Sequence, residues 1–321
     1  MPLLLAVICL ALLLIYPQDR LAAARDACLL WQQTVAPSLI PFFALIPALT
    51  CPEAAACFSR IMRLPCRMLG VQEAFAGAVG IAFAAGSPAG TKALMRIAAG
   101  STQPSGALFR SVMLCAGGSP GFLVSGVGAG MLGAPSAGMI LLLSQLLALI
   151  AAAGLLRLAV PDDAPVVIPH SAGAEASPVL FAVNGVLAIL IWMVTFAVGA
   201  RLIAILLPAA APFLPFAAEF SAGCAHAVKM RLPLWGVAAV VGFGGVCAGC
   251  QNLSVVRSAG ISPAMYFAGK AIHASLCALF ARLLCDVRLP QISFAPQHVL
   301  LWLLAACLLP RFHKIVTPAP K

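Results

Sequence analysis

The residues best suited to binding chemistry lie in two short polar stretches that interrupt long apolar runs. The first is Gly86-Ser87-Pro88-Ala89-Gly90-Thr91-Lys92, and the second is Gly118-Ser119-Pro120-Gly121. Neighbouring glycines and prolines break a helix, whereas a helix that restarts within a membrane presents free N–H groups that favour an anion. We therefore expect two hairpin tips facing a wet cavity, with Thr91 near the N-cap of a short helix and Lys92 adding a positive charge.

The second half of the chain holds ionisable and amide side chains within apolar sequence. Glu219 is flanked by apolar residues on both sides, and an acid inside a membrane bundle is a candidate for function, either paired with a cation or carrying a coupling proton. Lys270 and His273 are three residues apart, so they share a helix face and are candidate partners of Glu219 or of a substrate. Gln251 and Asn252 end a glycine-rich run and offer amide hydrogen bonds.

These observations predict a substrate-binding site and no catalytic or metal centre. The five histidines are dispersed and no nucleophile–base pair is evident, so an enzyme is not expected. Cys247 and Cys250 have C-x-x-C spacing, but no second cysteine pair or histidine is adjacent, so neither a metal nor another cofactor is expected. The candidate substrate-binding residues are Ser87, Pro88, Gly90, Thr91, Lys92, Ser119, Pro120, Gly121, Glu219, Gln251, Asn252, Lys270 and His273.

Composition determines the broad class. Hydrophobic residues make up 63% of the 321 residues and charged residues 9%, which is typical of an all-α polytopic membrane protein. Because a span needs about 20 apolar residues, we expect about eight to ten membrane-embedded segments, including re-entrant hairpins and broken helices. The net charge of +10 comes from basic residues scattered at the ends of apolar runs, which favours contact with membrane lipids over nucleic acid. The long apolar runs cover residues 2–16, 136–160, 179–207, 232–250, 264–285 and 296–310.

A polar linker, residues 161–177, divides the chain into membrane-embedded halves of comparable length, residues 1–160 and 178–321. Each half contains glycine-rich, proline-interrupted apolar sequence, as expected of a transporter built from two structural repeats. Local echoes support an internal duplication, but their offsets differ, so the register of the repeat is not determined. The echoes are EAFAG at 73–77 with EFSAG at 219–223, and GVGAG at 126–130 with GVCAG at 245–249.

Two segments of the first half depart from a simple span. Residues 31–49 contain prolines at positions 37, 41 and 47, each of which removes a backbone donor, so we expect a broken or re-entrant helix there. Residues 56–70 alternate basic and bulky apolar side chains at helical spacing. This pattern predicts a helix that lies in the plane of the lipid headgroups.

The ordered set of motifs resembles the YlbJ-type sporulation integral membrane proteins, also called SpoVV, which belong to the group with a nucleoside-recognition or gate domain. The resemblance implies an architecture similar to that of concentrative nucleoside transporters, with tips at 87–90 and 119–121, an acid at Glu219 and an amide region at Gln251. It also implies an endospore former, a location in the mother-cell or outer forespore membrane, and transport of dipicolinate. The matching motifs are GSPAGTK, GGSPGF, E-x-x-x-G, GFGG-x-C and K-x-x-H-A.

The favoured function is therefore a carrier for a small carboxylate, most simply dipicolinate, that works by alternating access. Dipicolinate is a planar dianion, which helix N-termini, hydroxyl groups and Lys92 are suited to bind. Two alternatives stay open. A nucleoside or nucleobase carrier would use Glu219, Gln251 and Asn252 as hydrogen-bonding groups, and a non-transporting membrane scaffold or sensor for sporulation would use the polar tips for packing or partner binding.

Overall fold

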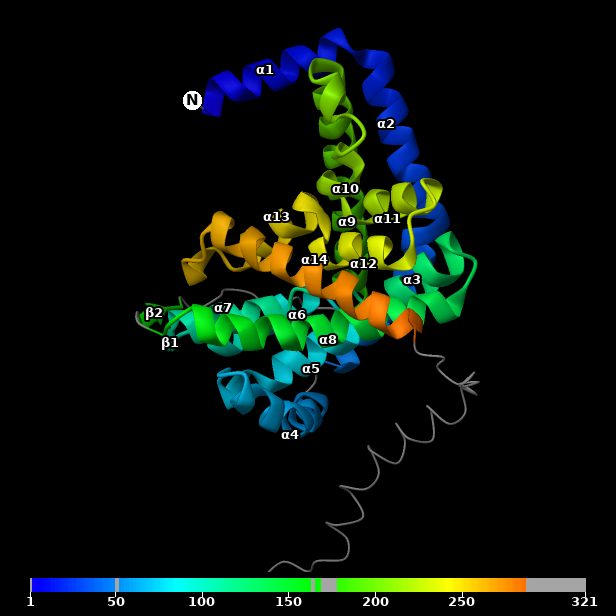
Figure 1. Ribbon diagram of the computed structural model, residues 1–321. Coiled ribbons are helices and arrows are strands. Elements are labelled where there is room, and N and C mark those ends of the chain that lie inside the picture. Colours follow the sequence, from blue (N-terminus) through cyan, green and yellow to red (C-terminus); the bar gives the residue numbers. More distant parts are fainter. Residues whose placement is uncertain (1, 50–51, 163–164, 169–177, 287–321) are drawn as a thin grey trace, which may run out of the picture. The chain divides into compact units, whose positions relative to one another are not determined.

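The computed structural model describes residues 2–49, 52–162, 165–168 and 178–286, and helices make up nearly all of them (Figure 1). Within these residues, five helical runs are long and apolar enough to cross a bilayer. The protein is thus an all-α polytopic membrane protein, as its composition predicts. The apolar run at 296–310 lies outside the described residues. The five runs are Pro17–Leu45, Pro135–Ala159, Val183–Leu206, Leu234–Val255 and Pro263–Cys285.

Helices α2 and α3 form one long run with the π turn between them, rather than the broken helix expected over 31–49, so that prediction is wrong. Between α2 and α3 the backbone forms a π-helical turn, η1, in which the N–H of Ala36 donates to the carbonyl of Trp31. The ring of Pro37 would collide with the carbonyl of Gln33 in a regular α-helix, and the wider π turn removes that conflict without breaking the run. The elements are α1 (Pro2–Ile15), α2 (Pro17–Leu30), η1 (Trp31–Val35) and α3 (Ala36–Leu49).

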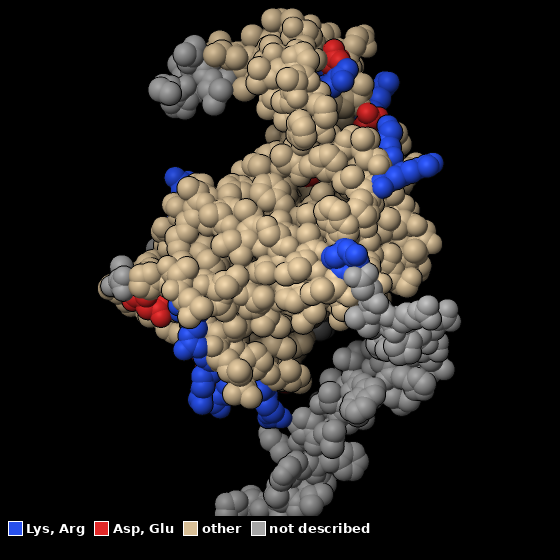
Figure 2. Space-filling model, viewed as in Figure 1, with Lys and Arg blue, Asp and Glu red and all other residues tan. Residues whose placement is uncertain are grey.

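An amphipathic helix, α4 (Pro52–Met68), packs along α5 (Figure 1). Its Arg63 and Arg67 are exposed and both pair with Glu73. Hydrogen bonds from Arg63, the larger cause, and from Arg67 hold the pKa of Glu73 below its ordinary value. Basic side chains gather at the lower edge of the face in Figure 2, where Figure 1 places α4. A position in the headgroup plane stays a prediction that this basic, amphipathic character favours.

The first half then continues with two pairs of short helices, each pair interrupted by a non-helical segment, and a long helix. Two short helices, α5 and α6, are joined by residues 86–88, which we call the first turn. Next, α7 and the π-helix η3 are separated by residues 115–121, the first break. The bounds are η2 (Glu73–Phe75), α5 (Ala76–Ala85), α6 (Ala89–Ala98), α7 (Ser105–Leu114), η3 (Phe122–Met131) and α8 (Pro135–Ala159).

The second half repeats this order of elements. After α9, which runs alongside α2 (Figure 1), the α10–α11 pair is interrupted at Glu219, the second turn, and α12–α13 is interrupted at Gly244, the second break. The long helix α14 follows as α8 does. The bounds are α9 (Pro178–Leu206), η4 (Pro208–Ala210), α10 (Leu214–Ala218), α11 (Phe220–Lys229), α12 (Leu234–Phe243), α13 (Gly245–Val255), η5 (Arg257–Ala259) and α14 (Pro263–Asp286).

This order of elements shows which of the two sequence echoes occupies the same structural position in both halves. The echo at 126–130 and 245–249 falls within η3 and at the start of α13, which are both the second piece of an interrupted helix. The other echo falls at different structural positions in the two halves. Glu73 begins η2, ahead of the α5–α6 pair, whereas Glu219 lies between α10 and α11. The domain boundaries at 160 and 178 stay predictions.

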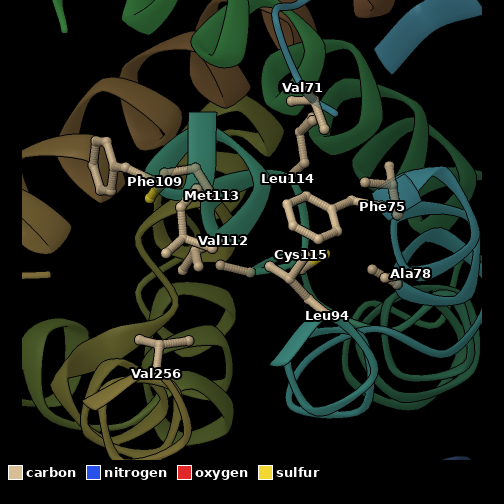
Figure 3. Close-up of a cluster of buried hydrophobic side chains, with 14 of the residues drawn as sticks. Val71, Phe75, Ala78, Leu94, Phe109, Val112, Met113, Leu114, Cys115 and Val256 are labelled. Atoms are coloured by element: carbon tan, nitrogen blue, oxygen red, sulfur yellow. The ribbon is translucent and has the colours of Figure 1, made fainter. Parts of the chain in front are cut away.

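The short helices are held by two clusters of buried apolar side chains. Figure 3 shows the first cluster, in which Phe75, Leu94, Phe109, Leu114 and Val256 converge. They come from η2, α6, α7 and the end of α13, so this cluster joins the two halves. The second cluster gathers buried residues of α3, η3, α8, α12 and α14. Because lipid tails are as apolar as these side chains, close van der Waals packing supplies most of the stabilisation.

A small strand pair ties the beginning of the linker to the first half. Strand β1 (Thr102–Pro104) pairs antiparallel with β2 (Pro165–Val167), with Gln103 opposite Val166. Beside it, the side chain of Arg110 in α7 is only 1% exposed and bonds to Asp162 at 3.0 Å. Arg110 also donates to the carbonyl of Gly70 at 2.8 Å and to that of Val160 at 3.2 Å.

Replacing Arg110 by methionine should lower the free energy of unfolding by about 2–4 kcal/mol, because two carbonyls lose their donor and Asp162 loses its partner. Thermal or denaturant unfolding of the purified protein in detergent measures this loss. Asp162→Asn is the matched control, since it keeps both carbonyl bonds and its side chain is half exposed. An equal loss in both variants would contradict the assignment of the two carbonyls as the main partners.

Candidate functional site

The first turn packs directly against the first break. Gly86 has φ +76°, and a Cβ atom built on it would lie 2.5 Å from the backbone N of Ser119. The N–H of Ser87 donates to the carbonyl of Gly117 at 2.8 Å. Only glycine allows both the positive φ and this close approach, so the two interruptions of the first half form one junction.

The second turn packs against the second break in the same manner. Gly245 has φ +73°, and a Cβ atom on it would lie 2.9 Å from the backbone N of Phe220 and 3.1 Å from Cα of Glu219. Gly244, with φ +77°, ends α12 in the left-handed conformation. The two halves therefore each bring a turn and a break together through a glycine.

One buried amide connects the halves at this level. Oδ1 of Asn252, in α13, accepts hydrogen bonds from the hydroxyl of Ser87 at 2.5 Å and from that of Thr91 at 3.0 Å. Its Nδ2 donates to the hydroxyl of Tyr266 at 3.0 Å. Asn252 is 1% exposed, so its amide fixes the first turn against α13 and α14.

A second amide supports the first break. Oε1 of Gln145, in α8, accepts from the N–H of Gly118 at 2.8 Å, and its Nε2 donates to the carbonyl of Gly118 at 3.0 Å. The hydroxyl of Ser119 accepts from the N–H of Phe122, the first residue of η3. The break thus keeps its backbone groups satisfied although it is not helical.

Behind the second break, α14 contributes a chain of buried polar groups. The ammonium of Lys270 donates to the carbonyl of Ala116 at 3.1 Å. Nδ1 of His273 lies 2.8 Å from the carbonyl of Gly242, which can only accept, so Nδ1 carries the hydrogen. Nε2 is then the acceptor for the thiol of Cys277 at 3.3 Å. His273 is fully buried and orients α14 against α12.

Glu219 occupies the second turn as a buried helix cap. Its Oε2 accepts from the N–H of Ala222 at 2.7 Å, and its side chain precedes the first turn of α11, where a carboxylate is favoured. The residue is 6% exposed. The ion pairs of the described residues do not include Glu219, so the expected pairing with Lys270 is not found in this arrangement.

These groups surround a central cavity of about 80 Å³. Both turns and both breaks contribute to its wall, as do side chains of α13 and α14. The volume suffices for a few water molecules, and it is well below the range of about 300–1,000 Å³ that small-molecule pockets occupy. The central cavity is therefore assembled from both halves, contains several polar groups and is small.

A larger cavity of about 630 Å³ lies next to it, among α2, α9, α10 and α11; we call it the vestibule. Small alanine side chains line much of it, together with Asp26, Arg201, His226 and Lys229. Figure 2 shows a hollow on this face with acidic atoms inside it, near the position of α10 in Figure 1. Among the lining residues, Glu219 is common to the vestibule and the central cavity.

Seven of the predicted site residues line the central cavity, and six do not. Thr91 and Gly90 are buried in the packing of α6, and Pro120 and Gly121 lie in the break away from the cavity wall. His273 lies behind Lys270. The lining residues are Ser87, Pro88, Ser119, Glu219, Gln251, Asn252 and Lys270.

Lys92 is the main difference from the predicted site. The structure places it on the exposed face of α6 and outside the cavity lining. Because α6 begins at Ala89 with Pro88 as its N-cap, Thr91 lies in the first helical turn rather than at the cap. Its hydroxyl turns inward, so the next residue, about 100° further round the helix, points outward. Lys270 is instead the basic residue of the cavity wall.

Sequence reasoning missed four contributors. Gln145 follows Ser144 in the middle of a long apolar helix, and Tyr266 is one of two tyrosines in the chain. The rings of Phe122 and Phe220 are tilted, with 4.9 Å between their centroids, and both line the central cavity. Polar side chains within an apolar run were a usable signal for Gln145, whereas nothing in the sequence marks the two phenylalanines as neighbours.

Comparison with known proteins adds no family to this description: no protein-family model matches the chain, and neither a curated protein nor a solved structure is significantly similar to it.

Replacing Gly86 by alanine should destabilise the protein by about 1–3 kcal/mol, because the positive φ is strained and the new Cβ overlaps the backbone of Ser119. The unfolding midpoint in detergent measures this effect. Gly199→Ala, within α9, is the matched control, since a Cβ there meets nothing within 4 Å. It should be neutral or slightly stabilising, and an equally mild effect at Gly86 would show that the junction yields easily.

Proposed function

We propose that the protein is a membrane carrier for a small carboxylate, with dipicolinate in an endospore former as the expected substrate, and that it works by alternating access. The observation that carries this proposal is the central cavity, around which interrupted helices from both halves meet. In a bilayer, non-helical backbone is tolerated only where protein buries it or where it lines a wet cavity. Broken helices around a midpoint cavity are the arrangement that secondary transporters use.

The charges in the cavity wall suit a carboxylate. Lys270 lines the cavity and bonds to a single backbone carbonyl, so its remaining N–H groups are available to an anion. Glu219 lines the same small space. An ionised Glu219 would repel a bound carboxylate, so binding favours the protonated form of Glu219. Substrate and proton would then move together.

The sizes of the two cavities support a closed arrangement. The central cavity is too small for an aromatic dicarboxylate, whereas the vestibule has the volume of a typical ligand pocket. Because Glu219 lies between them, substrate from the vestibule would pass this side chain. Admission requires the second turn to part from the second break, and the stacked Phe122 and Phe220 to separate.

A nucleoside carrier is the alternative within transport. Asn252 gives it little support, because hydrogen bonds within the protein already occupy both ends of its amide. Gln251 is the cavity amide with more freedom, since its Nε2 makes only a long contact of 3.5 Å with the sulfur of Cys247.

Purified protein in proteoliposomes should take up radiolabelled dipicolinate in a saturable manner. Excess unlabelled dipicolinate should compete, and uridine should not. Protein-free liposomes give the background. Competition by uridine would favour the nucleoside carrier, and the absence of flux for both compounds, with the protein shown to be folded, would favour the scaffold.

Glu219→Gln should leave the protein folded and reduce flux about tenfold to a hundredfold, or leave a flux that no longer depends on pH. The amide keeps the shape and can still accept from Ala222, but it cannot carry the proton that moves with the substrate. A loss of that size corresponds to about 1.4–2.7 kcal/mol on the barrier. Uptake at several pH values, at matched protein levels, tests this.

Glu73→Gln is the matched control, because Glu73 pairs with surface arginines outside both cavities. Its flux and pH dependence should equal those of the parent protein. Unchanged flux and pH dependence in Glu219→Gln would remove Glu219 from the coupling mechanism.

A further inference from the structure

Lys270 is a buried cation that lies near the ends of two broken helices and bonds to the backbone at one of them. Its side chain is 4% exposed and lines the central cavity. Nζ donates to the carbonyl of Ala116, two residues beyond the end of α7. Nζ also lies 3.6 Å from the position that a Cβ of Gly244 would take, at the end of α12. The ammonium therefore lies where the C-terminal ends of α7 and α12 approach one another.

The C-terminal end of a helix carries a partial negative charge and unpaired carbonyl oxygens. In transporters with discontinuous helices, such ends and the unwound carbonyls beside them coordinate the coupling cation. A cation is thus expected at this position for electrostatic reasons, and the structure places the ammonium of Lys270 there.

The surroundings of Lys270 contain no other strong partner. Within the residues that the structure describes, no carboxylate forms an ion pair with it. The nearby Nδ1 of His273, at 3.3 Å, already donates its hydrogen to Gly242 and so accepts nothing from Lys270. A buried ammonium without a carboxylate is costly, so its hydrogen bond to the carbonyl of Ala116 and the partial negative charge of the nearby helix ends are what stabilise it.

We propose that the ammonium of Lys270 is a tethered substitute for a coupling metal cation, so that the carrier works without sodium. This inference rests on the proposed function, since it concerns whether a sodium ion takes part in transport. In a sodium-coupled carrier the ion binds and leaves in each cycle. Here the cation stays on the chain, and a sodium gradient cannot drive uptake.

The first test measures stability without any substrate, so that its result does not depend on the transported compound. Lys270→Ala removes the ammonium and leaves a space among the carbonyls. Sodium chloride, or ethylammonium chloride as a replacement for the lost amine, should raise the unfolding midpoint of Lys270→Ala by several degrees above its value in choline chloride at equal ionic strength. The parent protein should show no such difference.

Two variants serve as controls. Lys270→Met fills the same space with an apolar chain, so neither sodium nor ethylammonium should stabilise it. Lys92→Ala removes an exposed lysine from α6 and should respond to the cations as the parent does. Stabilisation of the parent protein by sodium over choline would overturn the proposal, as would a folded Lys270→Ala that responds to neither cation.

If Lys270→Ala does not fold, the parent protein still decides the question. Flux of dipicolinate into proteoliposomes should be equal in sodium and choline media, and a sodium requirement for that flux would overturn the tethered cation while leaving the carrier in place. Absence of flux in both media would refute the carrier alone, because the parent's unfolding midpoint in sodium and choline tests the cation site separately.

Discussion

The arrangement depends on one constraint: polar backbone groups freed at membrane depth must find partners inside the protein. The two turns and two breaks leave backbone groups without helical partners, and other contacts of the protein satisfy these groups. Gly117 accepts from Ser87, and the amide of Gln145 satisfies both polar groups of Gly118. Lys270 donates to the carbonyl of Ala116 in the first break, His273 to that of Gly242 in the last turn of α12, and Glu219 caps α11. Once these partners are fixed, the relative positions of α8, α13 and α14 follow.

Glycine makes this arrangement compact. At Gly86 and Gly245 the missing side chain lets one interruption touch the backbone of another. The side chains of Asn252 in α13 and Lys270 in α14 then connect the halves, since they bond to Ser87 and Ala116 of the first half. The candidate site thus consists of two similar junctions, one in each half. Most of its hydrogen-bonding and charged side chains, such as Glu219, Asn252 and Lys270, come from the second half.

Much of the fold and part of the candidate site could be predicted from sequence. The remaining features depend on tertiary contacts. Composition was sufficient for the class, and Gly-Ser-Pro stretches marked the first turn and the first break because no continuous helix can contain them. Burial of Glu219 followed from its apolar flanks. The role expected of Lys92 required the helical phase of α6, which depends on its starting residue. The prolines after Trp31 suggested a broken helix, but a π turn precedes Pro37 and the helix continues through Pro41 and Pro47. The role of Gln145 could not be predicted, because its hydrogen-bond partner, Gly118, lies 27 residues away in the chain.

The double acceptance by Asn252 bears on how fast the protein could cycle. Parting the first turn from α13 breaks the hydrogen bond from Ser87 to Oδ1 of Asn252 and the bond from Thr91, whose single hydroxyl hydrogen is shared with the carbonyl of Pro88 at 2.8 Å. At about 0.5–1.5 kcal/mol each, these bonds would slow the parting by roughly fivefold to a hundredfold. In the carrier proposed above, the strength of these bonds would help to set how long the first turn stays against α13.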